Sequence, residues 1–347
     1  MKTSCYFDLK KIPLLFLFFF SLLIVKAQEL KGVVLNEKTN EPIIGASVYF
    51  NNTSVGTTTN FDGEFYINLQ QPINAPLVIS FVGFETKIHN ITHFDTKKTF
   101  KLREDVNTLE EVVLDSKDEW SRAFKLKQFR KEFLGRSAFA NQCTILNEDA
   151  LVLNFERDTK QLIASAKAPI IVKNEALDYI VKYDINDFYI TYNMDVNASL
   201  DLEKVFRTVA SVSYSGTTFF ENIETKKHKR AIKNRKKAYI GSTLHFMRAV
   251  ANNKLRQEKF KIFKGSYQVE PSNHIKTFKN DSLKVTEVHL SQKLNILCKG
   301  KQSAIESEVD RFIIDAYGNH SPIDKVLFGG FMANQRIGDV LPLDYGL

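Results

Sequence analysis

The strongest constraint on the fold is a series of short alternating segments in residues 28–115, separated by turn-forming residues. Apolar and polar side chains alternate along 46–50 and 65–69, as in strands that bury one face. Between them, Asn60-Phe61-Asp62-Gly63 predicts a hairpin turn, because glycine readily adopts a positive φ. Further strands are predicted at 30–35, 78–82 and 100–102. Short strands at this spacing, without a helical stretch, predict an all-β sandwich.

Four motifs are spaced along the same residues: Gly32–Val34, Pro42–Val48, Gly56–Phe65 and Ser80–Phe84. Together they resemble the carboxypeptidase-regulatory-like family, whose members have a transthyretin-like sandwich at the start of larger exported proteins. The following Leu109–Val113 resembles the segment that leads such domains into the plug of TonB-dependent outer-membrane receptors. The resemblance covers about a quarter of the chain. It implies a seven-stranded type of sandwich over 28–115 and a location, and it implies no reaction.

Two functions suggested by those names conflict with the residues. A plugged outer-membrane barrel needs about 22 strands of about 10 residues plus loops, which residues 116–347 are too few to provide. A zinc carboxypeptidase needs a His-x-x-Glu pair and a further histidine. None of the 7 histidines has a glutamate three positions later, so the zinc carboxypeptidase motif is absent.

The first 27 residues have the layout of a secretory signal peptide. Lysines precede an apolar run over 14–25, and Val25-Lys26-Ala27 provides small residues for cleavage after Ala27. The run is shorter than the ~20 residues of a membrane-spanning helix, and no later segment is apolar enough to span. We therefore expect export to the periplasm, outer membrane or cell surface, with no transmembrane helix after cleavage.

Residues 116–347 predict a second, α+β module of unknown function, so the chain as a whole is expected to be mainly β. Asp118 is the predicted cap of a helix over 119–134 that ends at Gly135, and a second helix is predicted over 242–257. Strands are predicted at 151–155, 162–166, 180–183, 188–192, 260–263, 283–290 and 311–314. Motifs such as Arg336–Tyr345 resemble the downstream region of exported proteins that carry the same regulatory-like domain. That resemblance implies a two-part architecture and no activity.

Charge is distributed unevenly between the two predicted modules. Residues 28–115 contain 7 basic and 12 acidic side chains, whereas the rest of the exported chain is basic. Much of the excess lies in one run without an acidic residue: Lys226, Lys227, Lys229, Arg230, Lys233, Arg235, Lys236 and Lys237. Such a run could bind an anionic polymer, lipid headgroups or an acidic envelope protein, or it could be a solvated helix face or loop. Nucleic acid is not expected, because the chain is predicted to be exported and the run lacks interleaved aromatic residues.

The other candidate sites are weak on sequence grounds. Cys143 and Cys298 could form a disulfide in an oxidising compartment, or they could be separate buried side chains. Cys143 with His245 could form a thiol site, although a packed histidine is the commoner arrangement. Asp62 and Glu64 offer too few oxygens for calcium. No cofactor, metal site or catalytic residue is predicted.

Three functions remain open at this stage. The first is a non-enzymatic binding or structural protein at the outer membrane or surface. The second is a hydrolase acting on envelope polymers, whose site would be built from scattered residues. The third is an accessory component of an outer-membrane transporter, suggested by Leu109–Val113. The missing catalytic motifs favour the first, and the identity of the ligand and the oligomeric state cannot be read from the sequence.

Overall fold

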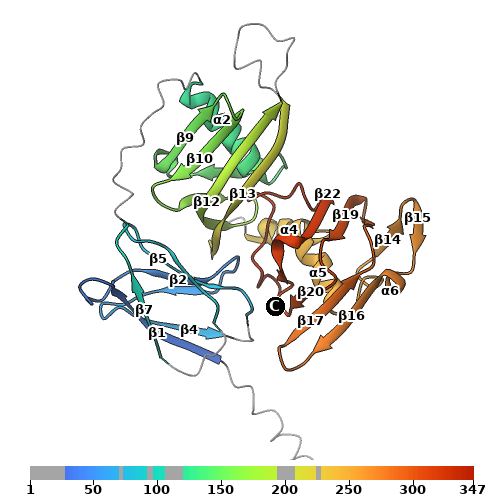
Figure 1. The fold of residues 1–347 in the computed structure, drawn as a ribbon, viewed down its shortest axis with the longest axis horizontal. Helices are drawn as coiled ribbons and strands as arrows, with labels where there is room; N and C mark the ends of the chain where they lie inside the picture. Colours follow the sequence, from blue (N-terminus) through green and yellow to red (C-terminus); the bar gives the residue numbers. More distant parts are fainter. Residues whose placement is uncertain (1–27, 70–72, 92–96, 106–119, 194–207, 224–227) are drawn as a thin grey trace, which may run out of the picture.

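The computed structural model describes residues 28–69, 73–91, 97–105, 120–193, 208–223 and 228–347, and these form a mainly β protein. The predicted fold class is thereby confirmed. Figure 1 shows three groups of elements in chain order: a sandwich in blue and cyan, a sheet with one helix in green and olive, and a pair of sheets in orange and red. The predicted signal peptide, residues 1–27, and the predicted boundary at 115/116 both lie outside the described residues.

The first group is the predicted seven-stranded sandwich. Its strands are β1 (Gln28–Asn36), β2 (Ser47–Phe50), β3 (Gly56–Thr58), β4 (Glu64–Leu69), β5 (Leu77–Ser80), β6 (Lys87–His89) and β7 (Lys98–Leu102). They form two sheets with the orders β4-β1-β7 and β3-β2-β5-β6, and the β1–β7 pair is parallel. Alternate side chains of both sheets, among them Leu30, Val48, Ile67 and Phe100, meet in one buried core.

The turn at Asn60-Phe61-Asp62-Gly63 is formed, but the predicted hairpin is wrong, because the flanking strands β3 and β4 belong to different sheets. Asn60 Oδ1 accepts hydrogen bonds from the backbone N–H groups of Asp62 and Glu64, at 3.0 and 2.8 Å. Gly63 has a φ of +69°, and a Cβ atom at this position would lie 2.6 Å from the carbonyl oxygen of Val34. The acidic residues of this segment therefore belong to a turn whose geometry requires glycine.

The second group is a six-stranded antiparallel sheet covered on one face by a helix. It contains α2 (Arg122–Phe133), β8 (Cys143–Ile145), β9 (Leu151–Glu156), β10 (Gln161–Ala166), β11 (Ile170–Asn174), β12 (Tyr179–Asn193) and β13 (Thr208–Asn222). The order is β8-β11-β12-β10-β9, with β13 along the other side of β12. The two strands predicted at 180–183 and 188–192 are one strand, whose pairing with β13 shifts register between Ile185 and Asp187 and again between Thr191 and Tyr192.

Helix α2 supplies aromatic side chains to the core of this sheet. Phe129 and Phe133 are almost fully buried, and both rings contact Phe188 of β12. The helix begins later than predicted: the side chain of Ser121 caps it by accepting a hydrogen bond from the Phe124 N–H, and the predicted cap Asp118 lies outside the described residues. A serine hydroxyl next to the first helical residue satisfies an otherwise unpaired N–H as well as an aspartate does.

The third group is two further sheets around α5 (Thr243–Ala251). One sheet has the order β15-β14-β18-β19-β22 and the other the order β16-β17-β20-β21. Their elements are β14 (Phe260–Lys264), β15 (Tyr267–Val269), α6 (Pro271–His274), β16 (Ile275–Asn280), β17 (Val285–Leu290), β18 (Leu294–Cys298), β19 (Lys301–Ser307), β20 (Phe312–Asp315), β21 (His320–Ser321) and β22 (Val326–Gly330). Helix α5 ends at Ala251 rather than near Gln257, because Asn253 adopts a positive φ of 54°.

The C-terminal segment holds the three groups together. Tyr317 is buried within the hydrophobic core of the sandwich. The carboxylate of Asp344 accepts a hydrogen bond of 2.7 Å from the Ser54 N–H and another from the Ser54 hydroxyl. The guanidinium of Arg248 on α5 donates to the carbonyl oxygens of Tyr317, Leu343 and Tyr345. Residues 317–345 therefore bridge the sandwich and the α+β part of the chain.

Candidate partner-binding face of helix α4

The predicted basic run forms helix α4 (His228–Tyr239), an element that the sequence did not distinguish from a loop. Lys226 and Lys227 lie outside the described residues. Along α4, the inward-facing residues are Ala231, Asn234, Arg235 and Ala238, and the remaining cations are exposed. A spacing of three to four residues places the buried set on one side of a helix and the exposed cations on the other.

Arg235 belongs to the core side of α4 and not to the exposed face. Its guanidinium donates hydrogen bonds to the carbonyl oxygens of Leu177 and Asp178, at 2.6 and 2.8 Å. It also stacks over the ring of Tyr179, 3.8 Å from the ring centroid. Beside it, the Asn234 amide donates to the carbonyl oxygen of Ala176 at 2.9 Å. These contacts attach α4 to the loop that precedes β12, so Arg235 is unavailable to a partner.

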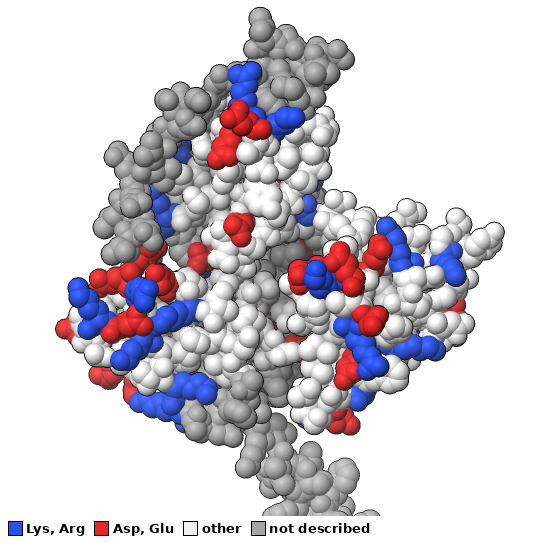
Figure 2. Space-filling view, viewed as in Figure 1, with Lys and Arg blue, Asp and Glu red and all other residues white. Residues whose placement is uncertain are grey.

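Five cations remain on the exposed face of α4, and we call this set the α4 basic face: Lys229, Arg230, Lys233, Lys236 and Lys237. Within the described part of the chain, none of these side chains forms an ion pair. Many other cations do, as in the pairs Lys31–Glu29 and Lys182–Glu221. Figure 2 shows basic and acidic side chains interleaved over the sandwich and over the C-terminal sheets. The α4 basic face differs from these two surfaces because all its charges are positive and none of them is paired with an acidic side chain among the described residues.

A half-buried lysine contacts the C-terminal end of α4. The Lys301 ammonium donates to the carbonyl oxygens of Lys237 and Ile240, at 3.1 and 2.5 Å. Burial lowers the pKa of Lys301. Cations near a helix C-terminus interact favourably with the helix dipole, and Lys236 and Lys237 occupy the same turn. The charge of α4 is therefore compatible with a stable helix, and its exposed cations need no internal acidic partner.

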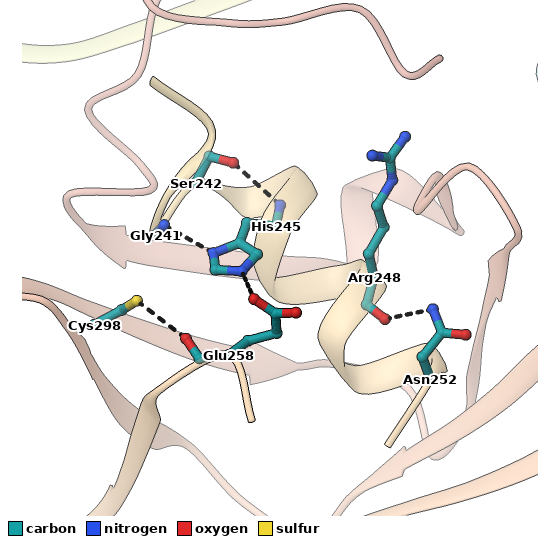
Figure 3. A network of polar contacts seen from close by, with 7 residues as sticks. All are labelled: Gly241, Ser242, His245, Arg248, Asn252, Glu258 and Cys298. Atoms are coloured by element: carbon teal, nitrogen blue, oxygen red, sulfur yellow. Dashed lines mark hydrogen bonds and ion pairs between the residues drawn. The ribbon is translucent and has the colours of Figure 1, made fainter. Parts of the chain in front are cut away.

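A polar network surrounds His245 after α4 (Figure 3). Ser242, His245 and Glu258 are the residue types of a catalytic triad, but they do not have its geometry. His245 Nδ1 accepts from the Gly241 N–H and Nε2 lies 3.0 Å from a carboxylate oxygen of Glu258. Because Nδ1 is an acceptor, Nε2 carries the proton and donates to Glu258. The Ser242 hydroxyl accepts from the His245 N–H and caps α5. Neither ring nitrogen remains free to take a proton from a nucleophile.

The two cysteines do not form the disulfide that the sequence allowed: both are free. Cys143 packs against the core of the six-stranded sheet, whereas Cys298 is buried in the core around α5. Burial raises the pKa of the Cys143 thiol to about 12 and also raises that of Cys298. A thiol with so high a pKa is protonated at neutral pH and is a poor nucleophile. Cys143 and His245 therefore do not have the properties of a thiol site.

A polar cleft of about 460 Å³ lies between the C-terminal end of α2 and the segment after β22. Glu132 and Asp339 line it together with three cations, and Glu132 pairs with Arg136. Burial raises the pKa of Asp339, although the Ser137 hydroxyl opposes this by hydrogen bonding to the carboxylate. Two carboxyl groups in one cleft, one of them with a raised pKa, are the smallest set of groups with which a protein could carry out acid–base catalysis.

Two further observations concern metals and membranes. In the parts of the chain that the structure describes, no three His, Cys, Asp or Glu side chains are grouped so that they could hold a metal ion. Among the same residues, no helix has the length and apolarity to cross a bilayer.

Comparison with known proteins supports the identity of the sandwich. Residues 30–114 match the family model of the CarboxypepD_reg-like domain, which confirms the resemblance found in the sequence. The TonB-dependent receptor SusC of Bacteroides thetaiotaomicron is 34% identical over 84 residues, which are 24% of this chain and 8% of the receptor. The TonB-dependent receptor P3 of Formosa agariphila is 35% identical over 103 residues, which are 28% of this chain and 10% of the receptor. The similarity to both receptors therefore covers a small part of their length.

Comparison of the whole fold is less informative. A crystal structure of a DUF3823 family protein from Bacteroides ovatus aligns with 84% of this chain and 99% of its own, at 7% sequence identity. The TM-score is 0.17, so the superposition does not establish a common fold. The family assignment consequently applies to the sandwich alone.

Proposed function

We propose that this protein is an exported, non-enzymatic binding protein of the cell envelope, and that the α4 basic face contacts an anionic partner there. The observation that carries the proposal is a set of five exposed cations on one side of α4 without an ion-pair partner among the described residues. Their positively charged surface attracts anions, and a partner with several negative charges would bind through several weak contacts at once.

Three structural features support binding over catalysis. The inward side of α4 carries small and polar residues, and its exposed side carries five cations and one large apolar residue, Ile232, so contact with a membrane would occur mainly through charge. Both nitrogens of His245 are hydrogen bonded, and both thiols have raised pKa values. The sandwich shares its family with domains found in two TonB-dependent receptors, which supports a location in the envelope. Phosphate-bearing lipid headgroups, an anionic polymer or an acidic envelope protein are the partners with suitable chemistry.

The proposal is tested by crosslinking in the native host. The envelope fraction is compared for the wild type and for a variant with Lys233, Lys236 and Lys237 replaced by glutamine. A matched control replaces Lys254, Lys276 and Lys279, which are equally exposed and lie elsewhere. We expect one crosslinked species that is lost only with the α4 variant. Equal crosslinking by both variants would exclude the α4 basic face as the contact.

Two alternatives are favoured by separate observations. The cleft with Glu132 and the raised pKa of Asp339 favours a hydrolase acting on envelope polymers. In that case, replacing Asp339 by asparagine would abolish turnover of the polymer without changing its binding. The relatedness of the sandwich to parts of two TonB-dependent receptors favours an accessory of an outer-membrane transporter. That function requires co-purification with a barrel protein.

A further inference from the structure

Strand β13 is long and lies at the edge of its sheet. It spans 15 residues, and among the described strands it pairs with β12 alone. Figure 1 shows it, in olive, along the border of the six-stranded sheet. An edge strand presents a row of backbone N–H and C=O groups on its outer side, which can pair with another extended segment.

The C-terminal half of this edge is already occupied by backbone groups of the sandwich. The Asn52 N–H donates to the carbonyl oxygen of Thr218 at 2.8 Å, and the Phe220 N–H donates to the carbonyl oxygen of Thr53 at 3.0 Å. A parallel bridge joins Thr53 to Phe219. The sandwich is thus docked on β13 through backbone hydrogen bonds from the turn at Asn52 and Thr53, and this interface stops near Thr217.

The N-terminal half of the same edge is open among the described residues. Between Thr208 and Gly216, no backbone hydrogen bond to another described residue is formed on the outer side. Because backbone groups alternate along a strand, Val212, Tyr214 and Gly216 present their N–H and C=O groups outward, as Thr218 and Phe220 do.

This edge also lacks the usual protection against pairing. Thr208–Phe220 contains no charged residue and no proline. Two other edge strands contain lysines, Lys98 and Lys101 in β7 and Lys276 and Lys279 in β16, whereas the three-residue edge strands β3, β8 and β15 are uncharged. Charged side chains and prolines are common means of preventing edge-to-edge association. Their absence along 13 consecutive residues of one edge indicates that pairing there is tolerated.

We propose that the open half of β13 pairs antiparallel with β13 of a second copy of the chain, which joins two six-stranded sheets into one. The occupant is a second copy because the strand is uncharged, so self-pairing sets no like charges opposite each other. A two-fold arrangement also closes, and it leaves no further open edge on β13.

The side chains fit an antiparallel pair centred on Ser213. This register places Val212 opposite Tyr214 of the second copy, and Ser211 opposite Ser215 of the second copy. Val212 lies against the core of the sheet, and the Tyr214 ring is 6.3 Å from that of Phe188. Pairs of an aromatic with a β-branched residue, and pairs of hydroxyl residues, are favourable across antiparallel strands.

Analytical ultracentrifugation of the purified protein, without any anionic partner, tests the proposal. The wild type is expected to associate reversibly to a dimer. Replacing Val212 by proline removes an outward N–H and leaves the bonds to β12, so this variant is expected to be monomeric. Retained Trp120 fluorescence and an unchanged urea midpoint would show that it is folded. A monomeric wild type, or a Val212→Pro variant that dimerises equally well, would overturn the proposal.

Two double variants keep the test decisive if the proline variant does not fold. With lysine at both 211 and 215, each lysine faces a lysine of the second copy, and dimerisation should weaken by roughly tenfold or more. With lysine at 211 and glutamate at 215, each charge faces its opposite, and the dimer should be retained. Equal affinities for the two double variants would contradict this register. Neither result depends on the α4 basic face, so the outcome is independent of the proposed function.

Discussion

Arg235 provides a quantitative test of the way in which α4 is held. Replacing it by methionine keeps much of the side-chain volume and removes two buried hydrogen bonds and a stacking contact. A hydrogen bond to a charged group contributes about 1.5–3 kcal/mol, and a desolvated cation–π contact contributes about 2 kcal/mol. The variant no longer has the desolvation cost of a buried guanidinium, which offsets part of this loss. We therefore expect the free energy of unfolding to fall by about 3 kcal/mol.

The assay is urea unfolding followed by fluorescence of Trp120, the only tryptophan of the chain. Trp120 lies in the core that also contains Leu177 and Tyr179, so it reports on the part of the protein that Arg235 supports. The matched control is Lys236→Met on the exposed side of the same helix, for which we expect a change within about 0.5 kcal/mol. Equal stability of the two variants would refute the structural role assigned to Arg235.

Three further predictions concern single groups. Burial lowers the pKa of His320 to about 4, so the stability contributed by the neutral imidazole is complete above pH 6.5 and is lost as the pH falls toward 4. The His320→Gln variant should therefore lose less stability than the wild type between neutral and acidic pH. An equal decrease in the urea midpoint of both proteins over this range would contradict this. Replacing Asp344 by alanine removes both hydrogen bonds to Ser54 and should destabilise the sandwich junction by about 2 kcal/mol; limited proteolysis should then cleave near that junction sooner, and an identical cleavage pattern would argue against this tie. The raised pKa of Cys143 predicts alkylation in the native protein many times slower than in urea, and mass spectrometry showing equal rates would refute it.

Much of the sandwich could be predicted from the sequence because its signals are local. Alternation along 65–69 identifies a strand with one buried face, and the Asn60–Gly63 turn depends on residues that are adjacent in the chain. Helix α4 could not be distinguished in the same way. Its buried side offers only small or polar residues, and the hydrogen bonds that fix Arg235 come from residues 57 and 58 positions away.

The candidate site shows the same limit. The sequence identified the basic run as a unit, yet only tertiary contacts separate the inward Arg235 from the exposed Lys236 beside it. The open edge of β13 had no sequence signal of its own, because an uncharged stretch such as Thr208–Phe220 is equally typical of a buried strand. Its position at the edge depends on which strands pair, and this is decided by the whole sheet.

Binding of an anionic partner by the α4 basic face can be measured by titrating the protein with labelled polyphosphate at low and high salt. We expect binding that weakens steeply with salt, because exposed charges are screened within a Debye length of about 8 Å at physiological ionic strength. Replacing Lys233, Lys236 and Lys237 by glutamine should abolish this binding. The control variant, with Lys254, Lys276 and Lys279 replaced, should bind as the wild type does. Binding that is retained by the α4 variant, or lost equally in the control, would contradict the proposed function.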